Sequence, residues 1–315
     1  MPNLIASPRF YKNKAILLKA EATVGTDAVP APLANWIEAR NVQFTPMEAE
    51  TAERNIDVPY FGNGGKLQVA QYARLSFEVA LAGPGTAGDA PKVAPALLAC
   101  ALSETLTAAT SAAYNLVSTA IGACSIYVNI DGALHKMVGS RGTVGVRLNA
   151  KAIPVLVFEF QSIYVDPSAQ TLPAVDRSGW PVEEPVSAAN STKLTLGGVD
   201  LAFSALELSL ANQIARINLP GPQIECAVTD RRPTGSVTVL APAFGTWDPF
   251  AVAKAGTNVA LSTTHGSAAG KQVKIDANVV LTDVAYEQIE GMAAYRIALE
   301  PTPVAGNDEL ALTYQ

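Results

Sequence analysis

Apolar and polar side chains alternate along this chain, and that alternation limits its possible folds more than any other feature. Residues 156–160 read Leu-Val-Phe-Glu-Phe, and residues 144–148 repeat the same period of two. This is the pattern of a strand with one face against a core. Asp131-Gly132 separates two further strand-like runs and is a strong signal for a two-residue hairpin turn. The sequence therefore predicts a mainly β fold.

Helical signals are confined to two short segments. Pro95 can occupy the first position of a helix, where its missing N–H costs nothing, and Leu98, Leu102 and Leu106 follow one turn apart. Pro249 similarly precedes residues 250–255, which are apolar except for Lys254. We therefore expect one helix beside each set of strands.

The strand patterns of the two halves match in order and type. The correspondence pairs residues 42–44 with 206–208, 76–79 with 236–239, and 156–160 with 295–299. Short alternating strands can also match by chance. If the repeat is real, each half contains one β-rich unit.

A proline-rich segment lies between the two halves. It contains Pro167, Pro173, Pro181 and Pro185, a composition typical of an extended connection. A chain of 315 residues is long enough for two domains. We expect two tandem β-sandwich or barrel domains, residues 1–166 and 191–315, each with one flanking helix and joined by a linker over 167–190.

The composition favours a surface that partners cover. Hydrophobic residues make up 49% of the chain and charged residues only 16%, against about a quarter in typical soluble domains. The net charge is −6, and residues 276–315 contain seven acids and one base, Arg296. Tight binding to nucleic acid depends on basic groups that displace phosphate counterions. The charge therefore argues against a DNA-gripping protein.

Motifs for catalysis, cofactors or metals are weak. Residues 83–88 fit a Gly-x-Gly-x-x-Gly pattern, but a loop follows where a helix should begin. The two histidines, His135 and His265, have no cysteine nearby, and the three cysteines lack metal-ligand spacing. No secretory signal or long apolar run is apparent. We expect a soluble protein that is not an enzyme and has no catalytic, cofactor or metal site, with reduced thiols.

Four segments together resemble one protein family. They are residues 18–30, 44–50, 77–98 and 131–144. In order and spacing they are similar to the tail tube, or major tail, proteins of long-tailed, non-contractile bacteriophages. The resemblance implies a structural virion protein made in the host cytoplasm, a β-sandwich whose inner strands join those of neighbouring subunits around a DNA channel.

The resemblance also implies a set of partners. The chain would assemble with itself into stacked rings. If the internal repeat supplies two tube domains per chain, three chains would form a ring with pseudo-six-fold symmetry; if only residues 1–166 form the tube, six chains would be needed. It would meet tail terminator and tip proteins at the tube ends and a tape measure protein inside. DNA would pass through without specific binding, and no membrane would be involved.

In that family a long loop reaches the adjoining ring, and residues 47–67 occupy its position here. The candidates for inter-ring contact are Met47, Glu48, Glu50, Glu53, Arg54, Asp57, Tyr60 and Phe61. A mobile surface loop is the simpler interpretation of the same segment.

The acidic C-terminal segment suggests a channel lining that repels DNA. The candidates for facing the lumen are Asp276, Asp283, Glu287 and Glu290. The same acids could instead keep the unassembled subunit soluble.

Two other function classes share this composition. A phage head-decoration or shell protein would assemble as trimeric knobs. A carbohydrate-binding β-sandwich would need exposed aromatic side chains, for which Trp36, Trp180 and Trp247 are the best candidates.

Overall fold

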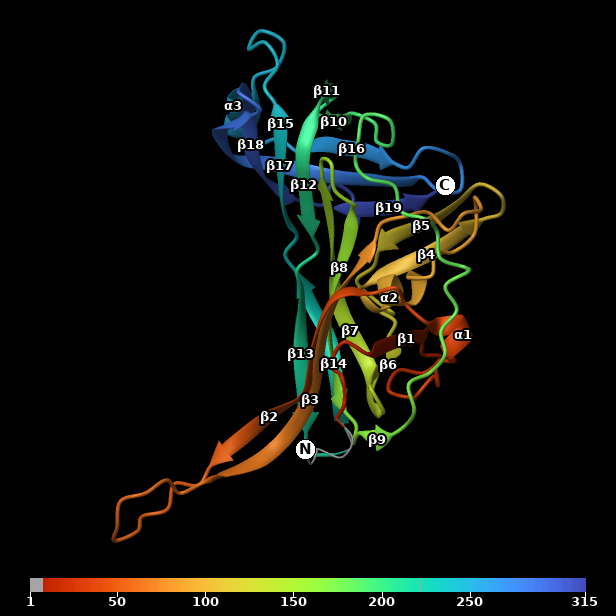
Figure 1. The fold of residues 1–315 in the computed structure, drawn as a ribbon. Coiled ribbons are helices and arrows are strands. Elements are labelled where there is room, and N and C mark those ends of the chain that lie inside the picture. The colour runs from red at the N-terminus through yellow and green to blue at the C-terminus, as the bar shows by residue number, and fades with distance from the viewer. Residues whose placement is uncertain (1–7, 222) are drawn as a thin grey trace, which may run out of the picture.

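Hydrogen-bonded strands dominate the computed structural model, which describes residues 8–221 and 223–315 (Figure 1). Residues 1–7 of the N-terminal segment lie outside the described residues. The strands are β1 (Lys14–Ala20), β2 (Arg40–Glu53), β3 (Lys66–Ala80), β4 (Leu102–Thr107), β5 (Ser111–Leu116), β6 (Cys124–Ile130), β7 (Ala133–Asn149), β8 (Val155–Tyr164), β9 (Ser168–Ala169), β10 (Leu194–Leu196), β11 (Val199–Leu201), β12 (Phe203–Ser209), β13 (Asn212–Leu219), β14 (Gln223–Arg231), β15 (Thr234–Leu240), β16 (Val259–His265), β17 (Val273–Ile289), β18 (Met292–Pro301) and β19 (Leu310–Tyr314). The mainly β fold that the alternation predicts is confirmed.

Each half of the chain contributes four antiparallel strands in the same spatial order. We call β2–β3–β8–β7 the N-terminal quartet and β12–β15–β18–β17 the C-terminal quartet. The registers also correspond. Ser76 lies between Gln43 and Glu159, and its counterpart Ser236 lies between Glu207 and Ala298. These are the positions that the two halves align in sequence.

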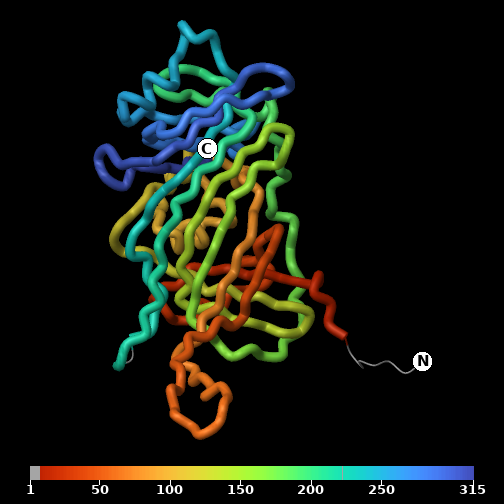
Figure 2. Tube along the Cα trace, turned by 90° about the vertical axis from the view of Figure 1, so that its left-hand side faces the viewer, coloured from red at the N-terminus to blue at the C-terminus, as the bar shows by residue number. Residues whose placement is uncertain are grey.

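The two quartets join edge to edge into one array of eight strands. β7 pairs with β12, from Gly145 opposite Ser209 to Asn149 opposite Ala205. Figure 2 shows β12, β7, β8 and β3 running side by side. The strands form open, sandwich-like layers rather than a closed barrel over the described part of the chain.

A second group of strands covers one face of the array. In the first half β6 pairs with β1 and with the beginning of β7, and in the second half β16 pairs with β10 and with the beginning of β17. β19 crosses between the halves, because it pairs with β17 on one side and with β5 on the other. The second half thereby binds the β4–β5 hairpin of the first.

The hydrophobic core runs through both halves without a break. Phe77 packs against Phe158 and Phe160, with ring centroids 5.4 and 5.9 Å apart. Leu208 and Ile297 of the second half belong to the same cluster of buried side chains.

The division into separate domains stays a prediction. Most of residues 167–190 lacks regular secondary structure, and Trp180 packs edge-on against Trp36 with centroids 5.9 Å apart.

The helices are short, and one differs from its predicted extent. α2 (Ala94–Ala99) ends because Ala101 adopts a left-handed φ of 65°, so Leu102 and Leu106 lie in β4 rather than on a helical stripe. The longer helix expected from leucine spacing is wrong. α3 (Pro249–Ala255) begins where Asp248 Oδ1 accepts the N–H groups of Phe250 and Ala251, at 2.9 and 3.1 Å. α1 (Pro32–Asn35) has no predicted counterpart.

Candidate assembly interface

The eight-strand array has one apolar and one polar face. Side chains such as Leu75, Phe158 and Leu208 enter the core, so their alternate neighbours point the other way. We call this second surface the polar face. It includes Arg74, Ser76, Glu78, Arg147, Glu159, Glu207, Ser236, Thr238, Glu287 and Arg296.

Glutamates neutralise Arg74 and Arg147 of the polar face. Arg74 Nη2 lies 3.2 Å from Glu159 Oε2. Arg147 contacts both quartets, with Nη1 3.2 Å from Glu78 Oε1 and Nε 2.9 Å from Glu207 Oε1. These pairs are about half exposed, so each adds little stability. Their main effect is to leave the face with little positive potential.

Both outer edges of the array are open among the described residues. At one edge, β2 pairs with β3 alone. At the other, residues 284–289 of β17 pair with β18 alone. Unpaired edges of this length offer backbone N–H and C=O groups to another strand, and natural proteins usually protect them.

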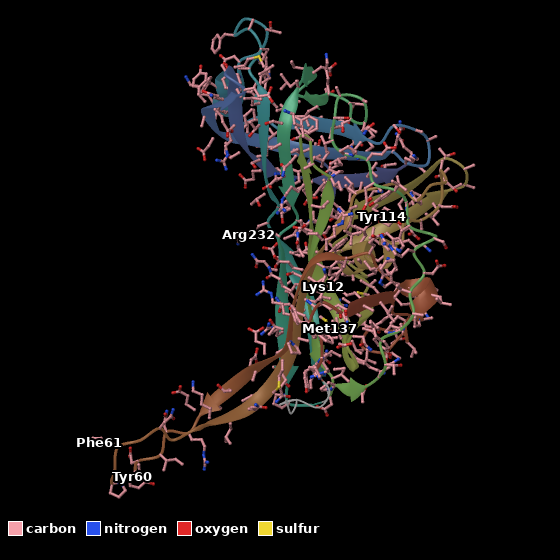
Figure 3. The ribbon with its side chains drawn as sticks, viewed as in Figure 1. Lys12, Tyr60, Phe61, Tyr114, Met137 and Arg232 are labelled. Atoms are coloured by element: carbon pink, nitrogen blue, oxygen red, sulfur yellow. The ribbon has the colours of Figure 1, made fainter. Side chains whose placement is uncertain are left out.

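β2 and β3 continue beyond the body of the molecule as a two-stranded arm (Figures 1 and 3). The sequence predicts a long loop over residues 47–67. The structure differs, because Met47–Glu53 and Lys66–Leu67 are strand and the connecting loop spans only residues 54–65. Glu53 pairs opposite Lys66, and Lys66 Nζ lies 3.1 Å from Glu53 Oε1.

The candidate inter-ring residues are spread along this arm. Glu48 lies near its base, where Arg216 of β13 binds its carboxylate and lowers its pKa. Met47, Glu50 and Glu53 follow along the exposed strand, while Arg54, Asp57, Tyr60 and Phe61 belong to the loop at the tip. The tip carries the most exposed aromatic side chains, because Phe61 is fully exposed and Tyr60 is 70% exposed.

The four candidate lumen acids do not lie together. Glu287 is on the polar face, near Thr238, whose hydroxyl donates to it at 3.2 Å. Asp283 lies in the bulge between Leu281 and Val284. Glu290 is in the β17–β18 turn, where Lys151 Nζ lies 2.6 Å from Glu290 Oε1. This hydrogen bond lowers the pKa of the Glu290 carboxyl. Asp276 lies outside the eight-strand array, in the part of β17 that pairs with β16 and β19.

The β13–β14 hairpin is an element of the interface that the sequence analysis missed. It lies beside β7 and β8, and Arg216 Nε donates to Gln161 Oε1 of β8 at 2.8 Å. Asn212 Nδ2 donates to the carbonyls of Gly142 and Cys100, at 2.9 Å each. The hairpin of the second half is thus bound to the quartet of the first.

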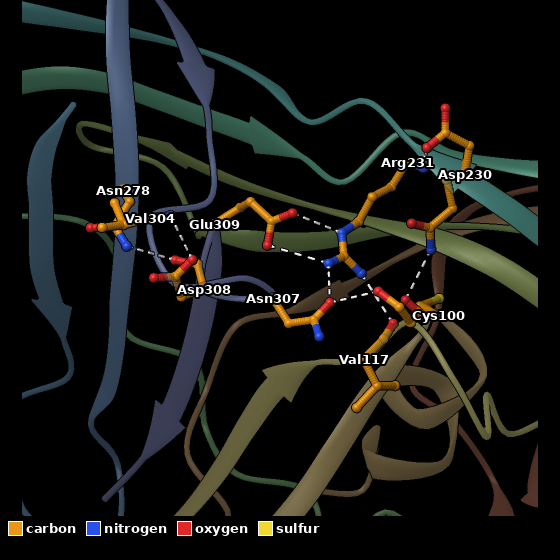
Figure 4. A network of polar contacts seen from close by, with 11 residues as sticks. Cys100, Val117, Asp230, Arg231, Asn278, Val304, Asn307, Asp308 and Glu309 are labelled. Atoms are coloured by element: carbon orange, nitrogen blue, oxygen red, sulfur yellow. Dashed lines mark hydrogen bonds and ion pairs between the residues drawn. The ribbon is translucent and has the colours of Figure 1, made fainter. Parts of the chain in front are cut away.

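A polar network fixes the base of this hairpin (Figure 4). The guanidinium of Arg231 binds Glu309 with Nε 3.0 Å from Oε1, and it donates to the Val117 carbonyl at 3.0 Å. Both side chains are largely buried, so the pair is protected from solvent screening. No local motif marks these residues, since their partners are distant in sequence.

Features needed for the alternative functions are weak. The indoles of Trp36 and Trp180 pack on each other, and Trp247 is only 7% exposed, so none offers a flat exposed platform for a sugar. All three thiols are buried, and burial raises the pKa of Cys226 to about 11. Within residues 8–221 and 223–315 we find neither a cluster of potential metal ligands nor a helix able to cross a membrane.

Comparison with known families decides between the remaining classes. The model of a family described as phage tail tube protein matches residues 12–314, nearly the whole chain. The chain belongs to the phage tail tube protein family. No curated relative matches it.

Membership fixes the broad role of the protein. A phage tail tube protein is a structural component of the virion tail and is not an enzyme. The match begins before β1 and ends within β19, so both quartets and the arm belong to the tail tube protein. The head-decoration and sugar-binding interpretations are therefore set aside.

Proposed function

We propose that three copies of this chain close into a ring in which six quartets form a continuous wall, and that the rings stack into the tube through which DNA leaves the phage. The observation that carries this proposal is the eight-strand array, made of two quartets in matching register and open at both edges. An open array of this kind is completed by further copies of itself.

The polar face is the side of the wall that suits the channel. It has small and polar side chains, and Arg74 and Arg147 are held by glutamates. DNA binds where cations can displace its counterions. A face with few available cations would let a polyanion slide. In this arrangement Glu287 is the candidate lumen acid that the array itself supports.

The arm suits contacts between rings. Its exposed tip, with Tyr60 and Phe61, projects from the molecule and is accessible to the adjoining ring. At the tube ends the same surfaces would bind the terminator and tip proteins, and the tape measure protein would occupy the channel before DNA does. Synthesis in the host cytoplasm fits the three buried, unoxidised thiols.

Electron microscopy of the purified chain and of virions tests this function. Rings with three-fold symmetry that stack into tubes would support it. Rings with true six-fold symmetry would mean that each ring contains six chains, with the second half of each chain outside the wall. Location of the chain in the virion head would overturn the proposal.

A further inference from the structure

The two quartets meet inside the chain at the β7–β12 junction, and the same pairing can be applied between the C-terminal quartet and the N-terminal quartet of a second copy. In the C-terminal quartet β12 is the edge strand that pairs with β15, as β2 pairs with β3 in the N-terminal quartet. At the opposite edge β17 pairs with β18, as β7 pairs with β8. The β7–β12 junction therefore shows how the last strand of one quartet accepts the first strand of the next. The open strands β17 and β2 are the same two strands without that partner.

We propose that residues 285–289 of β17 pair antiparallel with residues 41–45 of β2 in a second copy of this chain, in the register of the internal β7–β12 junction. Arg147 pairs opposite Glu207 inside the chain, and their counterparts are Glu287 and Gln43. Glu287 of one copy thus faces Gln43 of the next. This inference rests on the proposed ring and specifies the partner and register at its seams.

The burial of equivalent side chains supports the transposition. Val146 and Leu208 face each other at the internal junction, and each is only 2% exposed. Their counterparts are Tyr286 and Phe44. Tyr286 is 69% exposed in the single chain, and Phe44 is half-buried. Pairing of the two edges would bring these aromatic rings together and remove Tyr286 from water.

A hollow lies where the continuing strand would run. Beyond the internal junction, Asn212 of β13 binds the Gly142 carbonyl, and the hairpin then contacts β8 at Gln161. By pairing with β8 and β18, the counterparts of Gly142 and Gln161 are Leu281 and Glu300. Glu300 and Thr282, which follows Leu281 in the bulge of β17, line an open cavity of about 940 Å³. The strand β2 beyond Thr45 of the next copy would enter this cavity, as β13 follows β12 inside the chain.

Disulfide crosslinking of the assembled full-length protein tests the register. Gln43→Cys/Glu287→Cys and Thr45→Cys/Ala285→Cys place thiols directly opposite each other between copies. Mild oxidation should then convert the monomer band on a non-reducing gel into covalent oligomers that end at the closed ring. Thr45→Cys/Ile289→Cys places both thiols on the same face but four residues out of register. Their Cα atoms would then be farther apart than the about 7 Å that a disulfide can span. It should leave the monomer band.

Two controls separate the possible failures. Arg147→Cys/Glu207→Cys should form the equivalent bond within one chain and stay at monomer mass. Separately purified Gln43→Cys and Glu287→Cys proteins, each checked by its melting curve, should crosslink only after they are mixed. Rings that assemble without the matched crosslinks, or that favour the slipped pair, would overturn the register and leave the proposed function standing. A wild-type chain that forms no rings would overturn both.

Discussion

Arg147 and Glu207 face each other across β7 and β12, with Nε of the arginine 2.9 Å from Oε1 of the glutamate. This ion pair lies on the polar face at the seam between the two quartets. Directly beside it, on the apolar face, Val146 packs opposite Leu208. The seam therefore has an exposed polar side and a buried apolar side, whose contributions can be measured separately.

We expect the buried side to carry most of the seam's stability. Leu208→Ala should lower the free energy of unfolding by about 2–5 kcal/mol, because it leaves a cavity in a fully packed site. Glu207→Ala should cost less than about 1 kcal/mol, since the pair is half exposed and Arg147 keeps Glu78 as a partner. Urea denaturation of both variants provides the measurement. A larger loss for Glu207→Ala than for Leu208→Ala would contradict this account.

The tip of the arm should be dispensable for folding and required for stacking. Residues 54–65 can be replaced by Asn-Gly, which joins the paired residues Glu53 and Lys66 through a tight hairpin turn. The variant should melt at the wild-type temperature and form rings that do not elongate, as seen by electron microscopy. Tyr60→Ala/Phe61→Ala keeps the loop length and serves as the matched control for side-chain contacts. Tubes of normal length from the shortened arm would refute a role between rings.

Cations added to the polar face should slow DNA passage. Ser76 and Ser236 occupy equivalent positions in the two quartets, so Ser76→Lys/Ser236→Lys adds a matched pair of charges there. Phage carrying this variant should eject DNA more slowly at low salt and recover as salt rises, because the lysines exchange for counterions of DNA. Ala188→Lys/Ala189→Lys, at exposed positions of the connecting segment outside the array, adds the same two charges and is the control. Equal ejection rates for the two variants would show that this face does not line the channel.

Burial of His265 should make the fold less stable in mild acid. The imidazole is 1% exposed with Nδ1 2.9 Å from Ser191 Oγ, and burial lowers its pKa below the ordinary 6.5, although Glu184 opposes this. Above about pH 6.5 the histidine is neutral in both folded and unfolded chains. Below it the unfolded chain binds a proton that the folded chain resists, so stability falls by up to about 1.4 kcal/mol per pH unit.

His265→Asn should flatten this dependence between about pH 6.5 and pH 5, measured as the slope of unfolding free energy against pH. His135→Asn should flatten it less, because His135 is only partly buried and its pKa is also lowered. An unchanged slope in His265→Asn would show that other groups cause the acid sensitivity.

Sequence reasoning succeeded where local pattern determines structure. Alternation over residues 156–160 predicts β8, and Asp131-Gly132 predicts the β6–β7 turn, because each depends on neighbouring residues alone. The positions aligned between the halves, such as Ser76 and Ser236, also occupy equivalent places in the pairing.

It failed where distant residues decide the outcome. Leu102 has helical spacing from Leu98 but joins β4, since pairing with Leu116 of β5 outweighs the local pattern. The β7–β12 junction, the Arg231–Glu309 pair and the dispersal of the four candidate acids depend on contacts that no sequence period encodes. The arm illustrates both cases, because its place was predicted while its strand pairing was not.

β19 closes the gap between β5 and β17, yet it follows β5 by about 200 residues. At a synthesis rate of about 5–20 residues per second, the β4–β5 hairpin emerges from the ribosome about 10–40 s before its partner strand exists. Contacts between such distant segments also fold slowly. During this interval the nascent chain exposes the strand edges that β19 later covers, and unpaired strand edges are prone to aggregate.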